Sequence, residues 1–104
     1  MADESALEKA KRGEYGMELS GADLSGADLS WVNLQKANLT KANLSKSNLT
    51  GANLDKADLS GANLSGVDFT GVSLSWTTIA GALYDDTTKW PKHYNPKAQG
   101  AILA

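Results

Sequence analysis

The residues that could carry chemistry gather near the end of the chain. His93 is the one histidine among 104 residues, it lies between Lys92 and Tyr94, and there is no cysteine. A Cys–His nucleophile or a histidine metal cluster therefore cannot be assembled. Asp85 and Asp86 are adjacent carboxylates, but such a pair before two threonines is more typical of a turn than of an acid–base couple. The sequence predicts no enzyme activity, no catalytic residue, no metal site and no cofactor.

Three aromatic residues are the candidates for binding another molecule. Trp31 lies inside the regular middle of the chain, whereas Trp90 and Tyr94 lie in the irregular segment near its end. Exposed aromatic side chains are frequent anchors of protein–protein interfaces. The competing interpretation is that these rings cover the end of a folded core. The three residues are therefore predicted partner-binding positions with a purely structural alternative.

Composition describes the scaffold that must position these residues. The chain is 41% hydrophobic and 21% charged with a formal net charge of −2, which is ordinary for one folded domain. It holds no run of about 18 apolar residues that could cross a membrane. The charged start MADESALEKAKRGEYG lacks the apolar stretch of a secretion signal. We expect a cytoplasmic protein with no membrane association.

A repeat of five residues fills the middle of the chain. The 65 residues from Met17 to Gly81 divide into thirteen uninterrupted five-residue words. After Met17, the first place of each word holds a small or β-branched residue. The second, fourth and fifth places hold polar residues or glycine, except at Trp31, Trp76 and Ala80. The third place is always large and apolar: Leu19, Leu24, Leu29, Leu34, Leu39, Leu44, Leu49, Leu54, Leu59, Leu64, Phe69, Leu74 and Ile79.

Neither a helix nor a flat strand fits this period. At about 100° per residue, successive third-place side chains would lie about 140° apart around a helix, so no apolar stripe would form. In a flat strand, the inward phase slips by one residue per word. The pattern predicts a short extended piece with two inward side chains followed by a tight corner, where glycine suits unusual backbone angles. The period alone leaves open whether three, four or five words close one turn.

The words of the form A-(D/N)-L-x-x from Ala22 to Ser65 resemble the pentapeptide-repeat family, in particular its small bacterial members. That resemblance implies an all-β fold, a right-handed quadrilateral β-helix with four words per coil and about three coils. Third-place residues twenty apart would then stack, as in the column Leu34, Leu54 and Leu74. Larger residues near the end, such as Val67 and Phe69, indicate a wider or distorted last coil.

Three segments are expected. Residues 1–16 would form an N-terminal capping helix and turn, because Ser5 and Glu8 have capping-box spacing and a helix over 4–12 is predicted. Residues 17–81 would form the β-helix. Residues 82–104 leave the repeat, contain two prolines and are predicted to form a C-terminal capping tail, with Trp76 nearby. Covers are needed because the ends of a stacked coil expose apolar layers and unpaired hydrogen-bonding groups.

The predicted stacking also tests charged surfaces. Lys36, Lys41 and Lys46 fall on three different corners, and only Lys36 and Lys56 stack, so no nucleic-acid-binding stripe is expected. Each acidic row is interrupted by Asn or a hydroxyl residue. Such rows weaken the alternative that the chain is a DNA-mimic inhibitor of a type II topoisomerase (DNA gyrase), which the resemblance raises. The Asn and Asp side chains are expected to stabilise turns instead.

The sequence therefore predicts a non-catalytic structural or protein–protein interaction module. Its expected partner is another protein, with no direct nucleic-acid binding, and the expected state is a monomer or a weak end-to-end dimer. DNA mimicry remains the alternative function. The near-uniform words at 37–66 would also suit an engineered scaffold, although the irregular tail favours a natural origin.

Overall fold

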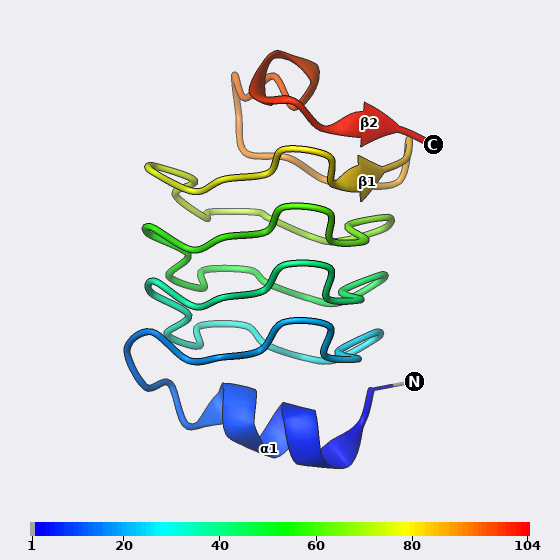
Figure 1. Ribbon diagram of the computed structural model, residues 1–104. Helices are drawn as coiled ribbons and strands as arrows, with labels where there is room; N and C mark the ends of the chain where they lie inside the picture. The colour runs from blue at the N-terminus through cyan, green and yellow to red at the C-terminus, as the bar shows by residue number, and fades with distance from the viewer. Residues whose placement is uncertain (1) are drawn as a thin grey trace.

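A computed structural model describes residues 2–104. The helix α1 (Glu4–Lys11) lies at one end, and the strands β1 (Leu83–Tyr84) and β2 (Ile102–Leu103) pair in parallel at the other. A 3-10 helix, η1 (Lys97–Gln99), precedes β2. Between α1 and β1 the chain winds in stacked turns (Figure 1). The molecule is a short rod that measures 32 × 24 × 20 Å.

Residues twenty positions apart are neighbours in successive turns. Asp23 forms a parallel bridge with Asn43, and Asn43 forms one with Asn63. Across the first of these bridges, the Leu24 amide donates to the Asn43 carbonyl at 2.8 Å, and the Asn43 amide donates to the Ala22 carbonyl at 2.9 Å. Four words therefore separate one residue from its neighbour in the next turn.

The third-place side chains form the core. All of them are buried except Leu74, which is half-buried. The first-place residues lie beside them and are mostly alanine or valine, so the chain can turn a corner without leaving a large void. Two buried threonines also use their hydroxyl groups: Thr77, at a first place, donates from Oγ1 to the Leu54 carbonyl at 2.8 Å, and Thr88, beyond the repeat, donates from Oγ1 to the Leu64 carbonyl at 2.9 Å.

The corners follow from the second and fifth places of each word. The second-place Asn or Asp accepts the amide two residues later, as Asn43 Oδ1 does from Ser45 at 3.0 Å. This local bond fixes the turn, which is the expected role of these side chains. The fifth place then has a positive φ, about 67° at Gly21 and 59° at Lys41. Glycine takes this conformation without steric cost, whereas lysine and tryptophan adopt it under strain.

Helix α1 covers the first turn. Ser5 was the predicted capping residue, but the helix is capped by Asp3, whose side chain accepts the Ser5 amide at 3.4 Å. The helix begins at Glu4, as predicted, and ends at Lys11, one residue before the predicted end. Asp3 is also held by a tertiary contact, since its amide donates to the Asp23 carbonyl at 2.8 Å and so fixes the chain just before the helix. Ala10 is fully buried, and Leu7 packs against the core beside it.

The stacking continues beyond Gly81, where the five-residue register ends. Leu83 bridges to Asn63, twenty residues earlier, but Lys89 bridges to Asp68, which is twenty-one residues earlier. One extra residue is therefore accommodated in the turn between β1 and Lys89. The Thr88 hydroxyl accepts the Gly66 amide at 3.1 Å and holds this longer turn to the preceding one.

Candidate interaction surface

Two exposed tryptophans occupy corners that elsewhere hold glycine or lysine. Trp31 is 78% exposed with φ 64°, and Trp76 is 81% exposed with φ 61°. The ring of Trp31 lies over Gly51 of the next turn, because a Cβ atom added at Gly51 would stand 2.4 Å from Cε3 of that ring. Two large apolar rings thus remain in water at strained backbone positions, although neither contributes to the core.

Both tryptophans border the same side of the rod, which we call the Trp face and define as residues 12–16, 32–36, 52–56 and 72–76. Trp31 immediately precedes the second of these segments, and Trp76 ends the last. The segments are neighbours, since the Gly16 amide donates to the Gln35 carbonyl at 2.9 Å and Asn33 bridges to Asn53.

A third exposed ring lies at the N-terminal end of the Trp face. Tyr15 is 59% exposed, and the Lys36 ammonium lies 5.9 Å from the centroid of its ring. This separation is within the range of a cation–π contact. Tyr15, Trp31 and Trp76 therefore mark three levels of one surface.

The regular pairing is interrupted on the Trp face at residues 72–76. The second-place residue there is Ser73 rather than Asn or Asp, and its Oγ accepts the Ser75 amide at 3.4 Å. The corresponding bond from Gln35 to Asn33 is 3.0 Å. In the described chain, Ser73 forms no bridge to Asn53. One backbone hydrogen bond joins segments 52–56 and 72–76 there: the Lys56 amide donates to the Ser75 carbonyl at 3.4 Å. A shorter side chain thus coincides with a loosened turn, and the half-buried Leu74 belongs to the same segment.

Trp90 and Tyr94, by contrast, belong to a stack of rings on the core. Trp90 stacks on Phe69 with centroids 4.9 Å apart and on Tyr94 at 5.3 Å, and it meets Tyr84 edge-on at 5.5 Å. Trp90 and Tyr94 are half-buried, and burial raises the pKa of the Tyr94 hydroxyl. No ring contact joins Trp76 to this stack within residues 2–104, although the sequence placed Trp76 near the tail.

Of the three predicted partner-binding residues, the structure brings Trp90 and Tyr94 together and places Trp31 apart from them, exposed at a corner two turns before Gly71. Sequence reasoning missed Tyr15 and Trp76 as members of the same surface as Trp31. The available signal was that Trp76, like Trp31, ends a word at a place that otherwise holds glycine or a polar residue.

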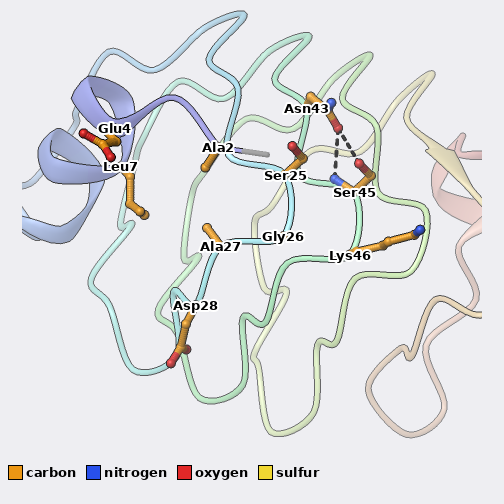
Figure 2. Close-up of a pocket in the computed structure, with 10 residues that line it drawn as sticks. All are labelled: Ala2, Glu4, Leu7, Ser25, Gly26, Ala27, Asp28, Asn43, Ser45 and Lys46. Atoms are coloured by element: carbon orange, nitrogen blue, oxygen red, sulfur yellow. Dashed lines mark hydrogen bonds between the residues drawn. The ribbon is translucent and has the colours of Figure 1, made fainter.

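A hollow of about 740 Å³ lies between α1 and the first two turns (Figure 2). Its charged lining residues are Glu4, Asp28 and Lys46. The Ser30 hydroxyl and amide donate to Asp28 Oδ1 at 2.7 and 3.1 Å, and these bonds lower the pKa of that carboxyl. Asp28 is therefore held as a carboxylate that is already hydrogen-bonded, which does not suit a proton donor at neutral pH.

The other shifted carboxyls follow the same rule. A hydroxyl two residues later lowers the pKa of Glu18, Asp23, Asp68 and Asp85 by donating a hydrogen bond to each. These carboxylates accept hydrogen bonds within their own turns and so stabilise them. Within residues 2–104, no group of three or more Asp, Glu, His or Cys side chains could hold a metal ion. In that same range, no helix combines the length and the apolar character that crossing a membrane requires.

Parallel pairing at a spacing of twenty residues, with a leucine core, defines the chain as a repeat solenoid. Comparison with family models then gives the family. The model for pentapeptide repeats matches residues 18–51, 37–75 and 47–83, with 8 copies of the repeat. The chain belongs to the pentapeptide-repeat family, whose members form β-helices.

One solved structure agrees with that assignment, and a second is similar in sequence. A pentapeptide repeat protein from Nostoc Pcc 7120 is similar with 27% identity and a TM-score of 0.52, over 99% of this chain and 96% of that one. The pentapeptide repeat protein Rfr23 from the cyanobacterium Cyanothece 51142 is 38% identical, with a TM-score of 0.49, over 70% of this chain and 60% of that one. A search of curated protein sequences gives no match.

Proposed function

We propose that this protein is a non-catalytic interaction module that binds another protein through the Trp face. The observation that carries this proposal is the pair Trp31 and Trp76, which are 78% and 81% exposed and flank one side of the rod. Tryptophan is among the residues most enriched at the energetic centres of protein interfaces. Trp90 and Tyr94 form a second, weaker candidate surface, because their rings already contact each other and the core.

Backbone strain supports the same proposal. A residue other than glycine at positive φ costs about 1–2 kcal/mol, and such strain persists where the position has another use. Lysine at a corner contributes solubility, but an exposed indole contributes no core packing and exposes apolar area to water. A bound partner would cover that apolar area, and the free energy of burying it would offset the backbone strain.

The test is affinity capture from the source cell with variants that keep the corner conformation. The double variant Trp31→Gly/Trp76→Gly removes both rings and relaxes the backbone, so it should fold and lose the partner. Lys41→Gly is the matched control, since Lys41 has the same positive φ but ends a word on another side of the rod. Equal recovery of one partner by both variants would refute a role for the Trp face.

DNA mimicry of a type II topoisomerase substrate is the alternative, and the ionised outer carboxylates Glu18, Asp23 and Asp28 favour it. The second-place residues that stack from turn to turn along the rod argue against DNA mimicry. Asp58, for example, pairs with Asn38 on one side and Thr78 on the other, so negative charge does not continue. Addition of the purified chain to a gyrase supercoiling assay at micromolar concentration decides between the two, and absence of inhibition removes this alternative.

The proposal includes the finer features implied by the family. We infer a right-handed, four-sided β-helix of about three coils, capped by α1 and by the tail 82–104. The exposed side chains of Leu83 in β1 and of Ile102 and Leu103 in β2 provide a surface for a weak end-to-end dimer. Sedimentation at rising concentration tests that dimer. A cytoplasmic location is also part of the proposal, and fractionation of the source cell tests it.

A further inference from the structure

We propose that the partner segment is an extended, acidic polypeptide that adds a β-strand to residues 72–76 at the C-terminal end of the Trp face. This inference rests on the proposed function and specifies the chemistry of the partner. It depends on three independent features of that edge: its unpaired backbone groups, the indole ring of Trp76 and its charge.

The backbone groups follow from the pairing rule of the earlier turns. On the Trp face, the Leu34 amide donates to the Asn53 carbonyl, the Lys36 amide to the Asp55 carbonyl, and the Val32 carbonyl accepts the Asn53 amide. The equivalent groups in residues 72–76, at the C-terminal end of the Trp face, are the amides of Leu74 and Trp76 and the carbonyl of Val72. None of these three groups has a backbone partner anywhere in the described chain.

The other sides of the last turn are covered to a greater extent. The Phe69 amide donates to the Lys89 carbonyl at 2.8 Å, the Gly81 amide to the Gly100 carbonyl at 2.8 Å, and β1 pairs with β2. The tail therefore closes these sides and leaves 72–76 open. Gly71, Ser73, Ser75 and Trp76 are exposed, so water or a ligand can reach the edge. Unpaired, accessible strand edges are the structural requirement for β-strand addition.

The charge of the Trp face indicates which kind of polypeptide segment would bind there. The Trp face carries Arg12, Lys36 and Lys56 against Glu14 and Asp55. Its second-place row, Asn33, Asn53 and Ser73, is also the one row of the four without a carboxylate. Within residues 17–76, the first side carries Glu18 and Asp58 against Lys41, the second Asp23 against Lys46, and the third Asp28 and Asp68 with no basic residue, so none of these sides has a net positive charge. In the following turn the second side gains Asp85 and Asp86, and the third gains Lys89.

The C-terminal tail adds positive charge near the open edge. Residues 87–104 lie at the same end of the rod as the open edge and contain Lys89, Lys92 and Lys97 with no Asp or Glu (Figure 1). An acidic segment is therefore attracted to this side and end of a molecule whose net charge is −2. Apolar side chains on one side of that segment would contact Trp76, which lies at the edge itself.

The experiment is an NMR titration of the full-length, ¹⁵N-labelled protein with the capped decapeptide EVEVEVEVEV. The amides of Leu74 and Trp76 and the indole N–H of Trp76 should shift, and the changes should saturate. The capped peptide KVKVKVKVKV should bind at least tenfold more weakly. A Glu–Val peptide N-methylated at alternate residues, which loses the donors of one edge, should also bind at least tenfold more weakly.

Matched protein variants test the site without removing its backbone. Ser73→Asp introduces a carboxylate into the row and should weaken the Glu–Val peptide at least fivefold, whereas Ser73→Asn should bind it within twofold of the parent. Both residues are the usual turn formers of this repeat. Equal affinities for all three peptides, shifts confined to another side, or shifts that grow with protein concentration in the absence of peptide would overturn the proposal. The last result would assign the edge to a second copy of the chain.

Failure here can be separated from failure of the proposed function. If Trp31→Gly/Trp76→Gly loses its cellular partner but no peptide binds residues 72–76, the interaction function stands and strand addition is wrong. If the variant retains its partner and no peptide binds, both proposals fall.

Discussion

The indole ring of Trp31 occupies the space in which a Cβ atom of Gly51 would stand, one turn further along the rod. A corner in one turn thus restricts the residue permitted at the same corner of the next. Gly51→Ala should destabilise the protein both through its positive φ of 69° and through this overlap. In a Trp31→Gly background only the first cost remains, so the two substitutions should be coupled by about 1 kcal/mol or more. Urea unfolding of the two single variants and the double variant measures that coupling, and additive effects would mean that the ring moves away freely.

The leucine column provides a second prediction. Leu54 is fully buried between Leu34 and Leu74, and so thin a core cannot collapse around a hole. Leu54→Ala should lower the free energy of unfolding by about 2–5 kcal/mol. Leu74→Ala is the matched control and should cost less, because Leu74 is half-buried in the loosened segment. Equal losses in chemical denaturation would contradict the described difference between the two turns.

Ser47 is a buried polar group at a first place where most words have alanine. Its Oγ has no hydrogen-bond partner in the described chain. Burial of an unpaired hydroxyl costs about 1–3 kcal/mol on mutational scales, so Ser47→Ala should stabilise the protein by about 1 kcal/mol. A calorimetric Tm below that of the parent would show that the hydroxyl is paired in solution.

The turn carboxylates predict how stability depends on pH. Hydrogen bonds from Thr70 and Ser25 lower the pKa values of Asp68 and Asp23 below their ordinary value of 3.8 in the folded state. Their contribution to stability is therefore complete well above pH 3.8 and is lost as the pH falls below that value. Asp23→Asn/Asp68→Asn should unfold in urea like the parent at pH 7, since Asn forms the same turn at other words. It should lose less stability than the parent between pH 4.5 and pH 2.5, and parallel pH profiles would contradict this mechanism.

Removal of the Trp90 ring tests the role of the tail. Trp90 lies between Phe69 and Tyr94, with centroids 4.9 and 5.3 Å away, so Trp90→Ala should cost about 3 kcal/mol and expose Phe69. Trp76→Ala is the control for loss of an indole, and it should change the urea midpoint little because its ring is 81% exposed. A larger loss for Trp76 than for Trp90 would show that the tail does not stabilise the last turn.

Much of the fold was predictable because the forces that form each corner are local. An Asn or Asp binds the amide two residues later, as Asn43 does with Ser45, and this bond needs no distant residue. The recurrence of large residues every five positions then identifies the inward side. The prediction that no Cys–His pair can form likewise rests on residue types alone, since the chain has one histidine and no cysteine.

The candidate surface was only partly predictable. Trp31 was recognised as an unusual corner residue, but its relation to Trp76 depends on the path of the chain around the rod. The weakness at Ser73 is a matter of a few tenths of an ångström in one turn bond, 3.4 Å compared with 3.0 Å at Asn33. Residue type alone does not show whether such a turn stays paired with its neighbour.

By itself, the sequence determined the repeating corner, the inward leucines and the family, because these depend on side chains within a few residues of one another. The tertiary structure decided the course of residues 82–104, where no period exists and burial against the last turn fixes the chain. It placed Trp90 and Tyr94 on Phe69, absorbed one extra residue before Lys89 and left residues 72–76 uncovered. These outcomes depend on which distant groups can bury apolar area and pair their backbone, and that competition is settled only when the whole chain is folded.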